Sequence, residues 1–101
     1  MKCSHKREKQ GIVIRFCGEL GHHEAAQCVE YLEKTMILYA NDPIILDLSG
    51  LTFMDSSGIA VVLRARRRME ALAGSLVVVN IPRQAARVLE TAGLGRYVNL
   101  I

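Results

Sequence analysis

The sequence predicts an α/β domain, in which a mixed sheet of four to five strands has helices packed against it. Three observations support this prediction. The chain has 101 residues, of which 50% are hydrophobic, so residues 1–101 fit one domain around one core. Strand-like apolar runs alternate with amphipathic helical stretches. From residue 44 onward the order strand, helix, strand, helix, strand favours parallel strands with right-handed crossovers, after a first hairpin that is antiparallel.

The first predicted element is this hairpin. Residues 2–8 are polar but extended in character, and residues 10–11 form a turn into Ile12–Phe16, which is rich in β-branched side chains. The pair therefore has a polar edge strand beside an apolar one. Gly18 and Gly21 are expected to end the second strand.

A helix and a central strand follow. Apolar residues recur at three- and four-residue intervals from His22 to Asn41, which predicts an amphipathic helix over that range. Pro43 prevents its continuation. Residues 44–48 are a continuous apolar run of the kind that is buried on both faces of a sheet. We therefore expect this strand at the centre of the sheet.

The second half of the chain predicts two more helices and two more strands. They are a helix over residues 56–74, a buried strand over Leu76–Val79, a helix over residues 82–93 and a short last strand over Tyr97–Ile101. Proline in a first turn and glycine after a last turn are common start and stop signals for helices. In sheets of this type, functional groups gather beyond the carboxyl ends of the strands.

The net charge of +3 comes from the first ten residues, which hold four basic side chains and one acidic one. Residues 11–101 hold nine of each. A basic terminus of this kind is more often solvated than a nucleic-acid-binding arm. We therefore expect no direct DNA binding.

The cysteines indicate the compartment. Cys3, Cys17 and Cys28 are odd in number and have no CxxC spacing, which predicts free thiols in a reducing environment. No apolar run approaches the ~20 residues of a bilayer span, and no apolar stretch of the secretory type follows the basic start. The spacing of cysteine and histidine matches no structural zinc pattern. We expect a cytoplasmic protein with no metal site and no membrane segment.

One segment combines the end of a strand, a tight loop and the start of a helix with reactive side chains: Asp55-Ser56-Ser57-Gly58. A helix start presents unpaired N–H groups and a partial positive charge. Asp55 is expected to cap the helix, which leaves Ser56 and Ser57 in the exposed first turn. Gly58 costs helix stability there, so either the backbone bends or another group approaches closely. On these residues alone, a plain capping segment stays open as the alternative.

The run from Leu46 to Ile59 resembles the signature of STAS domains, and specifically that of the anti-sigma factor antagonists. Residues 18–23 resemble the second conserved block of the sporulation members of that family. Residues 74–78 and 89–94 are similar to later elements, so the resemblance covers about residues 11–100.

The resemblance implies a regulatory switch rather than an enzyme. It implies that Ser56 is phosphorylated by the partner, an anti-sigma factor that is an ATP-using serine kinase. The unphosphorylated form would bind this kinase and release the sigma factor, and a serine phosphatase acting on Ser56 would restore it after phosphorylation. Asp55, Ser57 and Gly58 would frame the contact loop. ATP would be used by the partner kinase, so the chain itself would need no cofactor.

The same resemblance suggests further partner-binding residues. Gly21, His22 and His23 lie in the second block, and Arg64 and Arg67 lie on the helix that begins at the serines. Each group has a plainer interpretation. Histidines near a helix start often orient a loop or cap the helix. A helix with several arginines usually presents a solvated face. Sporulation antagonists usually carry an acidic residue at the position of Gly21, which affects a detail of the expected contact.

The family commonly adds a closing helix after the last strand, and residues 97–101 end this chain without one. One face of the sheet would then be less covered. An exposed apolar patch favours self-association, so we expect a tendency to form a weak homodimer.

Two other functions stay open as alternatives. A serine between a strand and a helix is also typical of a small serine hydrolase, although the nucleophile elbow needs Gly-x-Ser-x-Gly and Met54 stands where its first glycine belongs. A basic nucleic-acid-binding domain would use the charged terminus and the arginine helix.

Overall fold

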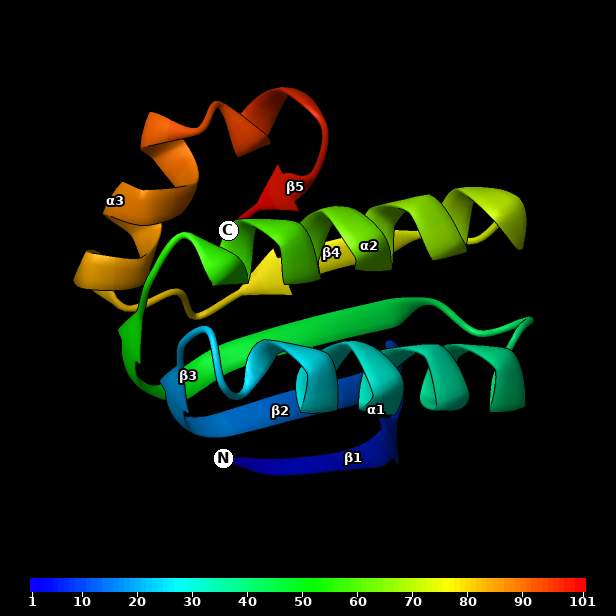
Figure 1. The fold of residues 1–101 in the computed structure, drawn as a ribbon. Helices are drawn as coiled ribbons and strands as arrows, with labels where there is room; N and C mark the ends of the chain where they lie inside the picture. Colours follow the sequence, from blue (N-terminus) through cyan, green and yellow to red (C-terminus); the bar gives the residue numbers. More distant parts are fainter.

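Five strands lie side by side in one mixed sheet in the computed structural model, which describes residues 1–101 (Figure 1). The strand order is β1-β2-β3-β4-β5, with the first pair antiparallel and every later pair parallel. The elements in chain order are β1 (Lys2–Glu8), β2 (Gly11–Leu20), α1 (Ala25–Leu38), β3 (Ile44–Met54), α2 (Ser57–Ala71), β4 (Leu76–Val79), α3 (Arg83–Thr91), a 3-10 turn (Leu94–Arg96) and β5 (Asn99–Leu100). The predicted fold class is confirmed.

The core lies between the sheet and one layer of helices. α1 and α2 run side by side over one face of the sheet, and α3 stands at the end where the parallel strands finish (Figure 1). Ile12, Ile14 and Phe16 alternate along β2 and are fully buried beneath the helices. Ile44 and Leu46 do the same on β3. The two-residue period of a strand thus places one apolar row against the helices and the other row on the opposite face.

β2 and β3 are longer than the sequence predicts. β2 continues past Gly18 to Leu20, and β3 continues past Leu48 to Met54, so the expectation that both strands end earlier is wrong. Gly18 adopts a φ of +115° beside a register irregularity at Glu19, after which Leu20 still pairs with Met54. The glycine therefore bends the pair without ending it, which is a known use of glycine within strands.

α1 is shorter than predicted. It covers Ala25–Leu38 rather than residues 22–41, because His22 and His23 lie in a turn and Tyr39 has a non-helical ψ of 46°. α2 lies within its predicted range.

The C-terminal end also differs. α3 ends at Thr91, and Gly93 then takes the left-handed φ of +73° that glycine favours after a helix. The predicted last strand shrinks to Asn99–Leu100, because the N–H groups of Tyr97 and Val98 bond back to the carbonyl of the 3-10 turn's first residue.

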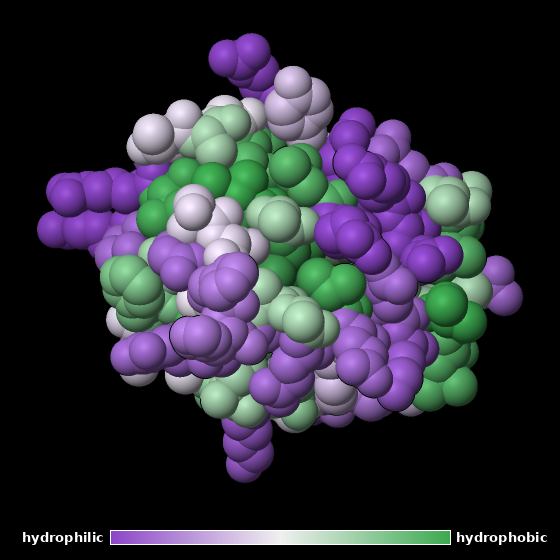
Figure 2. Space-filling view, viewed as in Figure 1, coloured by the Kyte–Doolittle hydropathy of each residue, from purple (hydrophilic) through white to green (hydrophobic).

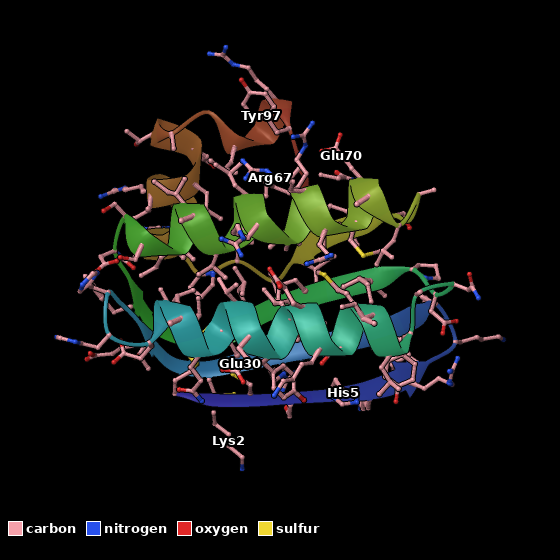
Figure 3. All side chains as sticks on the ribbon, turned by 45° about the vertical axis from the view of Figure 1, so that its right-hand side comes forward. Lys2, His5, Glu30, Arg67, Glu70 and Tyr97 are labelled. Atoms are coloured by element: carbon pink, nitrogen blue, oxygen red, sulfur yellow. The ribbon has the colours of Figure 1, made fainter.

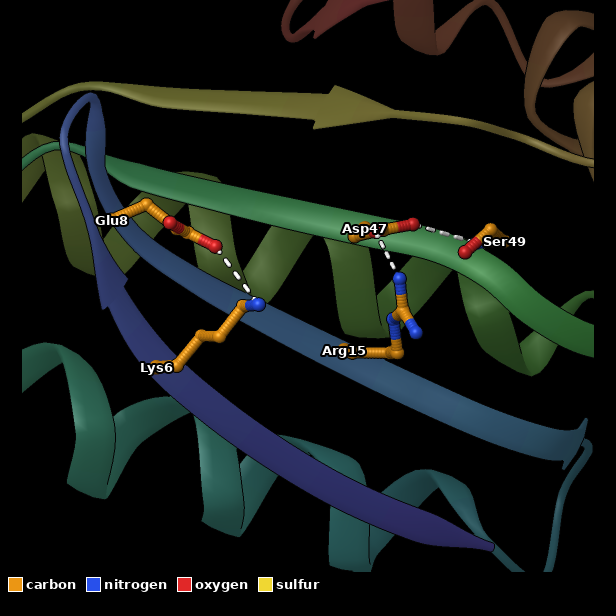
Figure 4. A network of polar contacts seen from close by, with 5 residues as sticks. All are labelled: Lys6, Glu8, Arg15, Asp47 and Ser49. Carbon is orange, nitrogen blue, oxygen red and sulfur yellow. Dashed lines mark hydrogen bonds and ion pairs between the residues drawn. The ribbon is translucent and has the colours of Figure 1, made fainter.

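The face of the sheet opposite the helices is open and forms a shallow hollow of about 820 Å³. Arg15 on β2 forms an ion pair with Asp47 on β3 at 3.0 Å, and the Ser49 N–H donates to the same carboxylate at 2.9 Å (Figure 4). Burial on its own would raise the pKa of Asp47. The hydrogen bonds from Ser49 and Arg15 outweigh burial, so this pKa lies below its ordinary value.

Replacing Asp47 by Asn should lower the free energy of unfolding by about 1–3 kcal/mol at neutral pH, because the Asp47 side chain is only 8% exposed and loses charged hydrogen bonds. A depressed folded pKa stabilises the fold above the unfolded pKa and ceases to do so as the pH falls through the folded pKa. The difference between wild type and Asp47→Asn should therefore shrink below about pH 4. Urea unfolding across this pH range measures it.

Asp42→Asn is the matched control, since Asp42 pairs with Arg7 at the surface at 3.3 Å. It should cost less than about 1 kcal/mol. An equal effect of both substitutions, or a pH-independent difference for Asp47→Asn, would contradict the role given to Asp47.

Some large apolar side chains remain exposed. Seen from the helical side, the surface is mostly hydrophilic, with apolar patches at the end of α1 and between α2 and α3 (Figure 2). The exposed large apolar residues are Ile37, Leu38, Phe53, Tyr97 and Ile101. The tendency to form a weak homodimer stays a prediction.

Candidate functional site

Two loops meet at the carboxyl end of the sheet. One is the turn after β2, which holds Gly21, His22 and His23, and the other is the loop between β3 and α2. Because β2 and β3 are parallel neighbours, their last residues Leu20 and Met54 pair, and both loops leave the sheet at the same point. The fold therefore brings together two segments that are 33 residues apart in the chain.

Asp55 joins these loops. Its Oδ1 accepts the Ser57 N–H at 2.7 Å, and its Oδ2 accepts the His22 N–H at 3.2 Å. The N–H of Asp55 also donates to the Leu20 carbonyl at 3.2 Å. The hydrogen bond from the Ser57 backbone lowers the pKa of Asp55 most, partial desolvation opposes it, and the His22 N–H lowers it further. Asp55 is ionised at neutral pH and fixes the geometry of both loops.

Asp55 caps α2 as predicted, but from one residue before the N-cap position. The N-cap position is Ser56, which has helical angles and makes no capping bond with its own side chain. The carboxylate that satisfies the helix start comes from Asp55, one residue earlier, through the Ser57 N–H. The difference is one residue in the position of the helix boundary.

The two serines differ in accessibility. Ser56 is exposed and its hydroxyl forms no hydrogen bond within the protein, whereas Ser57 is half-buried. Ser56 therefore presents a free hydroxyl at the start of α2, at the positive end of the helix dipole. Of the two, Ser56 is the one that the active site of another protein can reach.

Gly58 is buried, and the reason is a close approach. A Cβ at this position would lie 2.5 Å from Cγ of Met54, whose side chain is fully buried. Of the two explanations that the sequence allows, the approach of a neighbouring group is the correct one. Gly58 lets Met54 pack beneath the first turn of α2, so a contact between Gly58 and a partner stays a prediction.

The turn after β2 presents both histidines to solvent. Their rings are exposed and lie edge to face with centroids 5.7 Å apart. Neither ring caps α1, because neither forms a hydrogen bond and the N-cap position is held by Glu24 with no side-chain capping bond. The Glu24 carboxylate instead accepts the Gly21 N–H at 3.0 Å. The helix-capping interpretation of the histidines is therefore wrong, and their part in binding a partner stays a prediction.

The arginines of α2 divide into two kinds. Arg64 and Arg68 both bind Glu33 of α1, at 3.0 Å and 3.2 Å. The hydrogen bond from Arg64 is the largest cause of the lowered pKa of Glu33. These two arginines therefore connect the helices. The sequence does not predict the role of Glu33, because no local pattern indicates which residues of two separate helices form ion pairs.

Arg66 is bound within the protein, whereas Arg67 is free at the surface. Arg66 donates to the Tyr97 carbonyl at 2.9 Å and pairs with Glu70 at 3.1 Å. Arg67, labelled in Figure 3, is exposed and forms no ion pair or hydrogen bond. Of the two arginines predicted to bind a partner, Arg67 is unpaired and Arg64 is already engaged.

The geometry of the site can also be compared with that of a serine hydrolase and of a metal centre. No hydrogen bond joins Ser56 to His22 or His23, so the arrangement of nucleophile and base that a serine hydrolase needs is missing from this geometry. Groups of three or more side chains suited to hold a metal ion are also missing. None of the helices combines the length and apolarity required to span a bilayer.

Comparison with known proteins identifies the family. The STAS domain model matches residues 4–101. An anti-sigma F factor antagonist from Lysinibacillus sphaericus is 36% identical over 90 residues, which are 89% of this chain and 77% of the relative. The solved structure of the anti-sigma factor antagonist SpoIIAA in its unphosphorylated form has a TM-score of 0.80 at 31% identity, with 99% of this chain and 88% of that chain covered. The Bacillus cell fate determinant SpoIIAA in its phosphorylated form gives a TM-score of 0.72 at 31% identity, with coverage of 99% and 91%. The chain therefore belongs to the STAS domain family, among the anti-sigma factor antagonists.

Proposed function

We propose that this chain is a phosphorylation-controlled antagonist of an anti-sigma factor. Its unphosphorylated form binds an anti-sigma factor that is also a serine kinase, and this releases a sigma factor. Phosphorylation of Ser56 ends the binding, and a serine phosphatase restores it. The observation that carries the proposal is the exposed Ser56 hydroxyl at the start of α2, in a loop that Asp55 holds against the turn after β2.

The relatives support the proposal by name. Two curated relatives are called anti-sigma F factor antagonists, and SpoIIAA has been solved in an unphosphorylated and a phosphorylated form. The chain contributes an acceptor hydroxyl, and the partner contributes the kinase active site and ATP. A domain of this size can thus act as a switch without catalytic machinery of its own.

The charge at the site explains how phosphate would act. A phosphoserine carries about −1.5 to −2 charges at neutral pH, and an exposed helix N-terminus stabilises such a group by about 0.3–1 kcal/mol. The isolated domain therefore tolerates the phosphate. At an interface the phosphate would lie beside the ionised Asp55 against a partner's surface, where like-charge repulsion and desolvation oppose binding. Phosphorylation would then change the interface and leave the fold intact.

The partner would lie along one exposed face of α2. Ser56, Ala60, Arg64 and Arg67 are exposed at intervals of three or four residues, so they share one side of the helix. A partner whose active site reaches Ser56 would also cover this row. Arg67 is its unpaired cation, which suits an acidic patch on the anti-sigma factor.

Arg67→Glu should weaken binding to the anti-sigma factor kinase of the same organism by roughly tenfold, because it reverses a charge within the proposed contact. Titration calorimetry with the purified kinase measures the affinity. Lys9→Glu is the control, since it makes the same charge change in the β1–β2 turn at the opposite end of the sheet. Equal affinities for Arg67→Glu and wild type would exclude docking along this face, and absence of binding by wild type would reject the proposed function.

A further inference from the structure

The edge of β3 that faces β4 is left without a neighbouring strand just before the Ser56 loop. β4 pairs with β3 only as far as Asp47 and Val79, whereas β3 continues to Met54. On its other edge β3 remains paired with β2 up to Met54. Because the Met54 residue is fully buried, its N–H and C=O groups need partners from elsewhere.

Gln84 supplies both partners. Its side-chain amide donates to the Met54 carbonyl at 2.7 Å and accepts the Met54 N–H at 2.8 Å. A primary amide carries a donor and an acceptor side by side, so one glutamine replaces the missing strand at this residue. Gln84 is the second residue of α3, which the buried side chains of Ala85 and Leu89 anchor to the rest of the protein. α3 is thus tied to the last residue of β3.

Met54 transmits this constraint to the site. Its backbone is held by Gln84, its side chain packs under Gly58, and the next residue is Asp55, whose carboxylate arranges the Ser56 loop. Met54 is therefore linked to the start of α2 in two ways, through the chain at Asp55 and through the contact of its side chain with Gly58. Release of its backbone would loosen the strand end from which the loop departs.

We propose that Gln84 is a positioning residue for Ser56, which holds the end of β3 so that the Ser56 hydroxyl is presented in one geometry to the partner kinase. The inference rests on the proposed function of Ser56. Gln84 does not touch the hydroxyl itself and acts through Met54. A phosphoryl acceptor displaced by a small distance reacts much more slowly, although the docking surface along α2 is unchanged.

The test compares Gln84→Met with Arg87→Met. Gln84→Met keeps a side chain of similar length and removes both hydrogen bonds, and Arg87 is an exposed residue one turn further along α3 with no ion pair. Residue-resolved hydrogen exchange on the free protein should show the Met54 N–H exchanging roughly tenfold faster in Gln84→Met. Exchange in Arg87→Met, and at Ile14 and Leu46 in both variants, should match wild type.

The second readout is phosphorylation by the anti-sigma factor kinase. The kcat for Gln84→Met as substrate should fall roughly tenfold while KM changes little, because docking is retained and presentation is lost. Unchanged exchange at Met54 would overturn the inference, and so would faster exchange with an unchanged kcat. Absence of phosphate at Ser56 in wild type would instead reject the proposed function, while the exchange data still report whether Gln84 orders the strand end.

Discussion

Ser56→Ala should accept no phosphate from the anti-sigma factor kinase, whereas Ser57→Ala should be phosphorylated at a rate close to that of wild type. The two serines are adjacent, but only Ser56 is exposed with a free hydroxyl. The Ser57 N–H is bound to Asp55 at 2.7 Å, and Ser57 is half-buried as the first residue of α2. Incubation with the kinase and labelled ATP, followed by mass spectrometry of the peptide, measures both incorporation and position.

The adjacent serine makes this comparison a sharp control. Both variants lose one hydroxyl from the same turn, so a general loss of structure would affect them alike. Circular dichroism and urea unfolding of each variant should show a folded domain, because neither Ser56 nor Ser57 is part of the core. Equal incorporation into wild type and Ser56→Ala would show that the acceptor lies elsewhere.

Ser56→Glu should lower the affinity for the anti-sigma factor roughly 30-fold or more, which corresponds to about 2 kcal/mol or more. The new carboxylate would stand next to the ionised Asp55 and would be buried against the partner. Titration calorimetry with the kinase measures the loss. The free energy of unfolding of the isolated domain should stay close to that of wild type, because the helix N-terminus favours an anion at this position.

Ser56→Gln separates charge from size. It adds a side chain of nearly the same shape as glutamate without the charge, so it should weaken binding less than Ser56→Glu. If both variants bound the partner as tightly as wild type, Ser56 would lie outside the interface. A strong loss with Ser56→Gln equal to that with Ser56→Glu would indicate that bulk rather than charge ends the binding.

The sequence predicts much of this fold because its signals are local. Apolar runs identify β2, β3 and β4, helical periodicity identifies α1 and α2, and Pro43 and Gly93 follow the ends of α1 and α3. The polar strand β1 is recognised only from its extended character and the turn after it. The lengths of β2 and β3 are less predictable. Gly18 looks like a strand breaker and the apolar run of β3 stops at Leu48, but the ladder between the two strands continues past both points, since pairing with a neighbour outweighs local propensity.

The candidate site also has features that the local sequence predicts and contacts that it does not. Asp55 and Ser56 can be identified from their place at a strand end and a helix start, and the family resemblance selects Ser56 as the acceptor. Contacts between separate elements are not encoded in any local pattern. The ion pairs of Glu33 and the hydrogen bonds of Gln84 to Met54 depend on how α1, α2 and α3 pack, which only the tertiary structure shows.

The most direct test of the switch follows one sample through a full cycle. The affinity of wild-type protein for the anti-sigma factor is measured before phosphorylation, after stoichiometric phosphorylation confirmed at Ser56 by mass spectrometry, and after treatment with a serine phosphatase. The account predicts tight binding, then a loss of roughly 30-fold or more, then full recovery. Unchanged affinity of the protein phosphorylated at Ser56 would contradict it.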